Sequence, residues 1–373
     1  MQVEVEPQRE RNVQVKEDPQ IKRNAQVERD PQIERNVQVE GEPRTKIDLF
    51  IQEPPHLELR DIRRKKQSKL VIIKSEELDG NIYSLVETED KRIASGDSNG
   101  NISISSYDIN EKTWNRNIHK MRAHNKWVKS LCTLNGNRLL SGSSDCLIKL
   151  WSISDEDLTL IKEIKGHTDW VNKVIPLTKE RFASCSVDKT VKIWKDDKTY
   201  KCIFTLQADD EIMSILQLRG KEVLVSSCGT DSSPRVSFWD ITKYINKHTI
   251  KGYGVKEPTH MIELLNGNIA LSSKGDEYSY PIVIINTSSY QIIKRIDCNL
   301  DDMSSMCMFD EHSFIYIHYF KLLQISSKDY SILFESTNGH FGGHHSGVIP
   351  LEGGKYFAFG EGGRIMIITS SFV

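Results

Sequence analysis

The chain has 373 residues, of which 38% are hydrophobic, and its 50 Lys and Arg residues nearly balance its 52 Asp and Glu residues. These values are typical of a globular protein with a substantial core and exclude a fully disordered chain. Apolar runs such as IVII are far shorter than the roughly 18 residues of a membrane-spanning helix, and the opening MQVEVEPQRE lacks a signal-peptide stretch. The formal net charge of −2 lacks the basic footprint of a nucleic-acid-binding protein. A cytoplasmic protein is expected.

Seven cysteines are scattered along the chain, without a Cys-x-x-Cys pair or a cysteine–histidine cluster at zinc-ligand spacing. We interpret them as reduced, mostly buried small side chains rather than as disulfide or metal partners. His340, His344 and His345 in the segment HFGGHHSG are the alternative metal-binding candidates, but a glycine-rich surface loop is the favoured interpretation. We expect no metal and no other cofactor.

The first 46 residues contain a twelve-residue repeat, which reads PQRERNVQVKED, PQIKRNAQVERD and PQIERNVQVEGE. Each unit has few aliphatic residues, no aromatic residue and a proline that interrupts both helices and strands. Burial of so little apolar surface does not offset the loss of chain entropy, so a disordered polyampholyte tail is expected over 1–46. The alternative is a peptide array that binds one partner several times.

Residues 47–68 are predicted to be a linker, because the adjacent prolines Pro54 and Pro55 stop any regular element. The linker contains the basic cluster RRKK, from Arg63 to Lys66, which we interpret as a solvated charge run. A nuclear localisation signal is the alternative, so a nuclear location stays open beside the expected cytoplasmic one.

A longer repeat occupies the rest of the chain. The segment HNKWVKSLCTLNGNRLLSGSSDCLIKLW, which starts at His124, has a twin in HTDWVNKVIPLTKERFASCSVDKTVKIW, which starts at His167. Four positions keep an offset of 43 residues between the two segments. These pairs are His124 and His167, Ser141 and Ser184, Asp145 and Asp188, and Trp151 and Trp194.

Weaker copies extend this repeat along the chain. The residue that ends the first apolar run of each unit recurs at intervals of 41 to 46 residues. It is found at Thr88, Leu134, Leu177, Leu218, Leu264, Phe309 and Leu351. Periods of about 40 to 45 residues with short alternating strands and Gly, Asn or Asp turns are typical of four-stranded units repeated around an axis. The spacing therefore predicts an all-β fold with seven units.

The segments GHTDWV and ASCSVDKTVKIW resemble the WD40 family, whose repeats run from a Gly-His pair to a Trp-Asp pair. The resemblance covers about residues 70–373 and is strongest in the two units quoted above. It implies a seven-bladed β-propeller of four-stranded antiparallel blades over 69–373. It also implies that the matching His, Ser, Asp and Trp residues form a hydrogen-bonded structural tetrad in the second and third blades.

The chemistry of the tetrad residues agrees with a structural role. An Asp before a half-buried strand needs partners, and an imidazole, a hydroxyl and an indole N–H are the groups available nearby. A Ser, His and Asp trio also occurs in hydrolases, but here it recurs at a fixed period and with a Trp, whereas catalysis needs one site. We therefore predict no catalytic residues.

The other units depart from the repeat pattern. Only Trp239 is followed directly by Asp, and Ser105 stands where the first unit should have Trp. The histidine is replaced in the last four units by Ala208, Gly254, Asn299 and Phe341. We expect apolar strands such as VLVSSC, NIALSS, PIVIIN, SFIYIHY and RIMIITS to hold these blades together.

The last segment, GGRIMIITSSFV, leaves the seventh unit with only three strands. The segment KLVIIK, residues 69–74, lies just before the first blade and alternates suitably for a strand. We expect it to pair as the outer strand of the last blade and to cover an otherwise open sheet edge.

Function in a propeller depends on surface sites, because propellers serve unrelated roles. In the WD40 family, the positions three and five residues after the Gly-His histidine often contact partners. In this chain the resulting rim candidates are Tyr83, Trp127, Lys129, Trp170, Asn172, Glu211, Glu257 and Asp302. Aromatic residues on three adjacent blades and acidic residues on the next three favour a partner segment with an apolar anchor and Lys or Arg. The alternative is that the two Trp side chains pack between blades.

We therefore expect a non-catalytic protein–protein interaction scaffold or adaptor, with partner proteins rather than nucleic acid or a membrane as ligands. A ubiquitin-ligase substrate receptor is an alternative, although WSIS, WKDD and WDIT lack the Trp-Asp-x-Arg pattern frequent in that class. A propeller enzyme is the remaining alternative.

Overall fold

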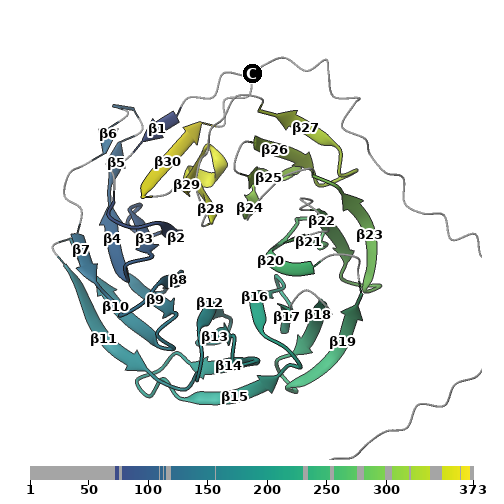
Figure 1. The fold of residues 1–373 in the computed structure, drawn as a ribbon, viewed down its shortest axis with the longest axis horizontal. Coiled ribbons are helices and arrows are strands. Elements are labelled where there is room, and N and C mark those ends of the chain that lie inside the picture. Colours follow the sequence, from purple (N-terminus) through teal and green to yellow (C-terminus); the bar gives the residue numbers. More distant parts are fainter. Residues whose placement is uncertain are drawn as a thin grey trace, which may run out of the picture. The chain divides into compact units, whose positions relative to one another are not determined.

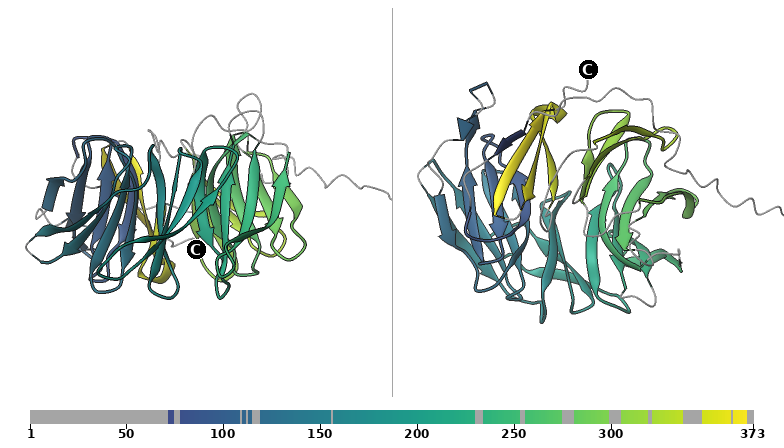
Figure 2. Two further views of the ribbon diagram at one scale, coloured as in Figure 1. Left: turned by 90° about the horizontal axis from the view of Figure 1, so that it is seen from below. Right: turned by 45° about the horizontal axis from the view of Figure 1, so that its top comes forward.

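The structure is a computed structural model that describes residues 72–74, 78–108, 110–111, 113–114, 119–155, 157–229, 234–252, 256–274, 281–298, 305–318, 321–336, 347–361 and 363–369. These residues form seven four-stranded antiparallel sheets that surround a central axis as blades (Figure 1; Figure 2). The predicted seven-bladed β-propeller is thereby confirmed. The repeat tail over 1–46, the linker over 47–68 and the three histidines of HFGGHHSG lie outside the described residues.

Each blade has its first strand next to the axis and its fourth strand at the circumference (Figure 1). The first blade contains β2 (Ile82–Glu87), β3 (Ile93–Asp97), β4 (Asn101–Ser105) and β7 (His119–Arg122), and the second contains β8 (Val128–Leu134), β9 (Arg138–Ser143), β10 (Ile148–Ile153) and β11 (Leu158–Ile164). The third contains β12 (Val171–Leu177), β13 (Arg181–Ser186), β14 (Thr190–Lys195) and β15 (Cys202–Gln207), and the fourth contains β16 (Ile212–Gln217), β17 (Val223–Cys228), β18 (Arg235–Asp240) and β19 (Ile245–Lys251).

The last three blades follow the same order. They contain β20 (Lys256–Glu263), β21 (Ile269–Lys274), β22 (Ile282–Asn286) and β23 (Gln291–Ile296); β24 (Ser305–Met308), β25 (Ser313–His318), β26 (Lys321–Ser326) and β27 (Ile332–Glu335); and β28 (Val348–Leu351), β29 (Tyr356–Glu361), β30 (Arg364–Thr369) and β1 (Ile72–Lys74), with a short 3₁₀ helix, η2 (Glu352–Gly354), after β28. A hairpin of β5 (Tyr107–Asp108) and β6 (Thr113–Trp114) interrupts the first blade, which the repeat pattern does not predict.

The seventh blade combines segments from opposite ends of the propeller sequence. β1 pairs antiparallel with β30, so that Ile72 lies opposite Ile368 and Lys74 opposite Met366. This is the outer-strand position in which the sequence analysis places residues 69–74, of which 72–74 are described. The pairing gives β30 a neighbour on both sides and joins the first and last segments of the ring.

The turn between the second and third strands repeats in the first three blades. Its left-handed residue is Gly100, Cys146 or Lys189, with φ of 85°, 70° and 67°. Glycine adopts this conformation freely, whereas a residue with a side chain loses about 1 kcal/mol or more. Asp145 and Asp188 offset that loss, because each accepts the backbone N–H two residues further on, at 3.1 and 3.0 Å.

Serine side chains on the inner strands connect neighbouring blades. Ser84 in β2 accepts the N–H of Leu131 in β8 at 2.8 Å, and Ser130 in β8 accepts the N–H of Val174 in β12 at 3.1 Å. Ser305 makes a bond of the same kind, at 2.9 Å, between the sixth and seventh blades. These bonds link the inner strands of neighbouring blades directly.

Apolar side chains fill the space between blades. Each sheet packs on a neighbour at both faces, so its middle strands are buried on both sides, as β17 and β22 are over nearly their whole length. Phe314 and Phe357, in the second strands of the sixth and seventh blades, are fully buried. The later blades are therefore held by apolar strands, as the sequence analysis expects.

Candidate functional site

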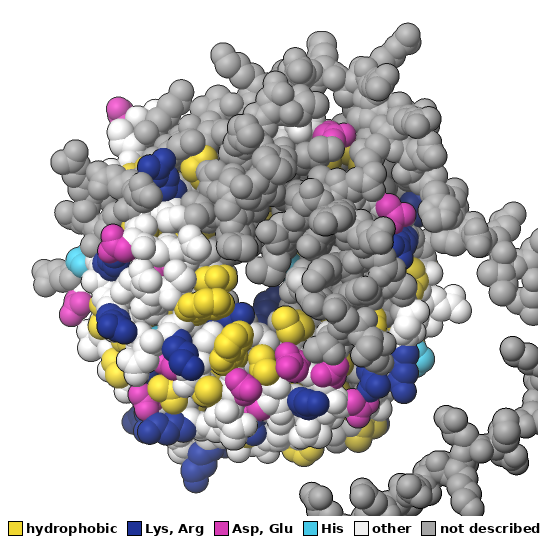
Figure 3. Space-filling view, viewed as in Figure 1, with side chains coloured by type: hydrophobic (Ala, Val, Ile, Leu, Met, Phe, Trp, Pro, Cys, Tyr) yellow, Lys and Arg dark blue, Asp and Glu magenta, His cyan; other side chains and the backbone are white. Residues whose placement is uncertain are grey.

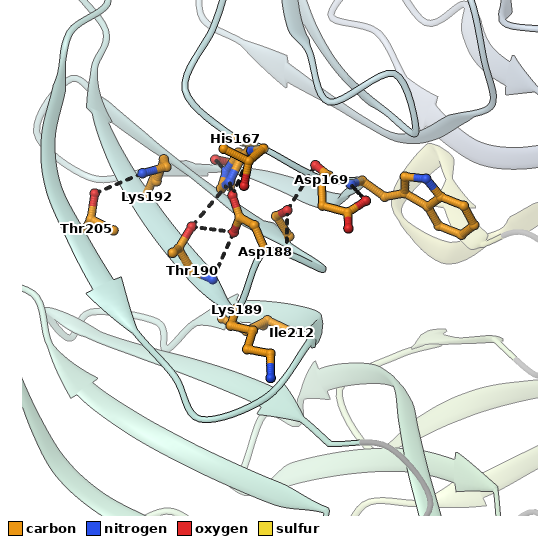
Figure 4. Close-up of polar contacts among 12 residues, drawn as sticks. His167, Asp169, Asp188, Lys189, Thr190, Lys192, Thr205 and Ile212 are labelled. Carbon is orange, nitrogen blue, oxygen red and sulfur yellow. Dashed lines mark hydrogen bonds and ion pairs between the residues drawn. The ribbon is translucent and has the colours of Figure 1, made fainter. Parts of the chain in front are cut away.

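The third blade contains a hydrogen-bonded chain of four side chains. His167 precedes β12, Ser184 lies in β13, Asp188 in the following turn and Trp194 in β14. The Nδ1 atom of His167 lies 2.7 Å from Oδ2 of Asp188, toward which the ring points (Figure 4), and its Nε2 atom lies 2.7 Å from Oγ of Ser184. The indole N–H of Trp194 donates to the same serine oxygen at 2.8 Å. The structure thus brings all four residues of the predicted tetrad together.

The direction of each bond in this chain follows from the carboxylate, which can only accept hydrogen bonds when ionised. Nδ1 of His167 therefore carries a proton and donates it to Asp188. In the neutral ring, Nε2 is then an acceptor for the hydroxyl of Ser184, whose oxygen accepts from Trp194. Each of these buried groups has a partner, so the hydrogen bonds offset the cost of removing the four side chains from water and stabilise the blade.

The second blade repeats this arrangement. Nδ1 of His124 lies 2.9 Å from Oδ2 of Asp145, and its Nε2 atom lies 2.7 Å from Oγ of Ser141. The indole N–H of Trp151 donates to Ser141 at 2.8 Å. The offset of 43 residues between the two segments therefore corresponds to one and the same set of contacts in adjacent blades.

The two tetrads differ in the bonds to their aspartates. The hydroxyl of Thr190 donates to Asp188 at 2.6 Å, whereas the apolar Leu147 occupies the equivalent position beside Asp145. Burial by itself would raise the pKa of each carboxyl, but hydrogen bonds from the imidazoles lower it, to about 2 for Asp145 and well below the ordinary value for Asp188. Both aspartates are therefore ionised at neutral pH.

Burial limits what the two tetrads can do chemically. Ser141 and Ser184 have no exposed surface, and the imidazole side chains of both histidines are 0% exposed. Each serine oxygen is held between an imidazole and an indole, where a substrate cannot reach it. A catalytic serine must instead be open to substrate. The tetrads therefore join the loop, strands and turn of one blade.

The fourth blade keeps part of this hydrogen-bonded set, although its repeat lacks the histidine. The indole N–H of Trp239 donates to Ser226 at 2.9 Å, while Ala208 stands in place of the histidine. Asp240 instead holds the next turn and accepts from the N–H and hydroxyl of Thr242 at 2.9 and 2.6 Å. The signal for the tryptophan contact is the fourth residue of VLVSSC, which matches the tetrad serine of RFASCS.

Three aromatic residues on adjacent blades, Tyr83, Trp127 and Trp170, lie side by side, and we call them the aromatic surface. The rings of Tyr83 and Trp127 stack with centroids 5.1 Å apart, and the centroids of the two indoles are 6.1 Å apart. The indoles remain 40% and 39% exposed. Nζ of Lys129 lies 5.9 and 5.3 Å from their ring centroids, so the surface carries its own cation.

The remaining rim candidates divide into three groups. Asn172 is only 9% exposed and donates to the carbonyl of Ile212 at 2.9 Å, so it joins the third and fourth blades instead of facing a partner. Glu211 is partly exposed just before β16, and Glu257 belongs to β20. Asp302 lies outside the described residues. In Figure 3, hydrophobic side chains border the centre of the propeller and acidic side chains lie close to them.

A cavity of about 370 Å³ lies at the centre of the propeller, between the inner strands. Its lining includes the basic residues Lys129, Lys173 and His260, and the hydroxyls of Ser84 and Ser214. Nζ of Lys173 donates to Oγ of Ser214 at 3.2 Å. The repeat pattern identifies Lys129 but neither of the other two basic residues. The rim positions lie three and five residues after the histidine position of each repeat, and Lys173 and His260 occupy neither of them.

Five of the seven cysteines are buried, which agrees with their interpretation as small core side chains. In the part of the chain that the structure describes, no three His, Cys, Asp or Glu side chains are grouped closely enough to hold a metal ion. Likewise, none of the described segments forms a helix with the length and apolar character needed to cross a membrane.

Comparisons with known proteins agree with this geometry. Residues 115–152 and 158–195, which contain both tetrads, match the family model "WD domain, G-beta repeat". The chain is similar to the crystal structure of the WD40 β-propeller domain of Doa1, with a TM-score of 0.66 and 15% identity over 80% of this chain and 96% of that one. At this identity the likeness concerns the fold alone. The resemblance to the WD40 family is confirmed, and the chain is a seven-bladed propeller that carries WD40 repeats.

A curated relative is described as a probable cytosolic Fe-S cluster assembly factor of Schizosaccharomyces japonicus, and it is 29% identical over 79 residues. The match covers 21% of this chain and only 13% of the length of the relative. WD40 propellers are commonly protein-interaction scaffolds and are typically not enzymes, although one fold can serve several functions.

Proposed function

We propose that this protein is a non-catalytic scaffold that binds partner proteins through the aromatic surface. The observation that carries the proposal is the exposure of two adjacent indoles, Trp127 at 40% and Trp170 at 39%, whereas Trp151, Trp194 and Trp239 are buried and Trp114 is partly buried. Large aromatic side chains that remain exposed and rigidly packed are the usual anchors of protein interfaces.

The proposed partner segment carries an apolar anchor and a basic residue. The anchor packs on Trp127 and Trp170, which together with Tyr83 present a wide and rigid apolar surface. Because Lys129 already lies over both indole rings, a second cation is disfavoured there. The basic residue of the partner is therefore expected beside the partly exposed Glu211, on the blade next to the one with Trp170.

The test is affinity purification with quantitative mass spectrometry, in which the full chain and its variants serve as bait. The double variant Trp127→Ala, Trp170→Ala is expected to reduce recovery of the bound partners by at least about tenfold, since each anchor typically contributes 2 kcal/mol or more. The matched control is Leu160→Ala, Ile161→Ala in β11, where both side chains are 44% exposed at the circumference. This control is expected to keep the partners.

Thermal unfolding of both double variants establishes that each is folded. If the aromatic double variant is folded and retains every partner, the proposal is wrong. A bait that lacks residues 1–46 distinguishes partners of the repeat segment from partners of the propeller. A partner lost only from that bait binds the repeat segment.

A further inference from the structure

The central cavity carries basic side chains without a matching acid. Lys129 projects from β8, Lys173 from the adjacent β12, and His260 from β20. Among the described residues, no carboxylate lines this cavity or lies within ion-pair distance of either lysine. Two lysines from neighbouring blades thus share one cavity without a counter-charge from the described part of the chain.

Both ammonium groups are poorly solvated. Burial lowers the pKa of Lys129 and of Lys173 below the ordinary lysine value. Lys173 donates to Ser214 at 3.2 Å, while the nearest partners of Lys129 are the two indole rings of the aromatic surface. A cation with so few partners in a low-dielectric cavity gains more from a bound anion than an exposed lysine does.

Uncharged polar groups complete the lining. Burial, and after it the charge of Lys173, lowers the pKa of His260 to about 3, so this imidazole is neutral at physiological pH. Ser84 accepts the N–H of Leu131 at 2.8 Å, which leaves its own hydroxyl hydrogen for a ligand. The volume of about 370 Å³ equals that of about twelve water molecules, so a small anion fits with part of its hydration.

We propose that the central cavity is a binding site for a phosphate-type oxyanion, held by the ammonium groups of Lys129 and Lys173. The oxygens of such an anion accept charge-assisted hydrogen bonds from both lysines and a further bond from a serine hydroxyl. The same chemistry is presented by a free phosphate and by a phosphorylated side chain of a partner. Lys129 also lies over the two indoles, but this site does not depend on the proposed scaffold function, because anion binding requires the two ammonium groups and no partner protein.

The test is isothermal titration calorimetry of the full-length protein with sodium pyrophosphate in a chloride buffer of constant ionic strength. Binding at millimolar or lower concentration is expected. The variants Lys129→Met and Lys173→Met each keep a long side chain but remove the charge, and each is expected to weaken binding by about tenfold, as for the loss of one charged hydrogen bond. The control Lys198→Met changes an exposed lysine and is expected to leave binding unchanged.

A second titration uses a short phosphoserine peptide and thereby separates the two sources of phosphate. Binding of pyrophosphate supports a free anion as ligand, whereas binding of the peptide alone, lost in the same lysine variants, supports a phosphate carried by a partner. The proposal is overturned if neither probe binds at millimolar concentration, or if binding survives in the folded double variant Lys129→Met, Lys173→Met. The variant Trp127→Ala, Trp170→Ala keeps both lysines and is expected to keep pyrophosphate binding. Retained partners in this variant contradict only the proposed scaffold surface, whereas absence of anion binding in the unmodified protein contradicts only the proposed anion site.

Discussion

The third and sixth blades have the same four-strand topology, but different side chains hold them. In the third blade, a buried polar chain runs from His167 through Ser184 to Trp194. In the sixth blade, the buried rings of Phe314 and Tyr316 pack against aliphatic side chains of the fifth. The same interface also contains polar contacts, because the hydroxyl of Tyr330 accepts from the side-chain amides of Asn266 and Asn268 at 3.2 and 2.7 Å.

This difference shows that a propeller blade has two separate requirements. The first requirement is that a blade packs against its neighbours, and apolar side chains fulfil it in all blades because each sheet is buried between two others. The tetrad adds a connection within one blade, between the loop, the turn and the second and third strands. A blade without the tetrad can therefore keep its place in the ring while losing the sequence signature of the repeat.

The largest effect is expected from Trp194→Ala in the third blade. Trp194 is 2% exposed and stacks on Phe182 with ring centroids 6.0 Å apart, so its loss creates a cavity and leaves Ser184 without a donor. The free energy of unfolding is expected to fall by about 3–5 kcal/mol, measured by urea titration. The control Trp127→Ala removes a 40% exposed indole and should cost no more than about 1 kcal/mol. Equal losses would show that Trp127 is a packing residue and would contradict the aromatic surface as a binding site.

A smaller effect is expected from removal of the tetrad hydroxyl. Ser184→Ala leaves the buried imidazole of His167 and the indole N–H of Trp194 without a partner, at a cost of about 2–3 kcal/mol. The matched variant Ser226→Ala in the fourth blade affects only the indole of Trp239 and should cost about 1 kcal/mol. Urea titration of both proteins compares the complete and the partial chain. Similar losses would mean that the histidine bond adds nothing.

Acid is expected to weaken the second and third blades before the sixth. The pKa of Asp145 is lowered to about 2 and that of Asp188 is also lowered, so both carboxylates stabilise the folded state above their unfolded pKa of about 3.9. This stabilisation is lost as pH falls from about 4 toward 2, and at pH 3 the loss is partial and smaller than that of Ser184→Ala. Hydrogen exchange at graded pH should show β12–β14 opening before β24–β26. The reverse order would refute the assignment.

The smallest effect is expected from Thr190→Val, which makes the third blade resemble the second. The variant keeps the shape of the side chain but removes the bond of 2.6 Å to Asp188, and it should cost about 1 kcal/mol. The pKa of Asp188 should rise as a result, which carboxyl NMR titration measures directly. Leu147→Thr in the second blade is the reciprocal variant and should lower the pKa of Asp145. If neither pKa moves, the threonine is not what distinguishes the two tetrads.

The regular parts of the structure were predictable from particular residues. The shared offset of His167, Ser184, Asp188 and Trp194 from their counterparts predicts one set of contacts made twice, and the structure contains both sets. Apolar segments such as VLVSSC predict the strands of the later blades, because a short and mostly apolar run is typical of a strand whose sheet is covered on both faces. The contact between Trp239 and Ser226 in the fourth blade was not predicted, because Ala208 replaces the histidine that marks the repeat.

The candidate site was predictable only in part. The positions of Tyr83, Trp127 and Trp170 follow from the repeat, but their stacking and the place of Lys129 over the indoles depend on the distance between blades. Asn172 shares the repeat position of Lys129, yet its amide bonds to the next blade and is buried. A repeat pattern gives the position of a residue along the inner strand, whereas the exposure of its side chain depends on which residues of the adjacent blade lie beside it.

The sequence by itself determined the blade count, the identity of the two tetrads and the aromatic residues of the rim, because all three depend on periodicity and local chemistry. Only the tertiary structure decided which polar side chains face the centre. Lys173 and His260 come from separate blades and meet in one cavity because seven inner strands surround a single axis. Closure of the ring brings together residues far apart in the chain, and no local pattern records that proximity.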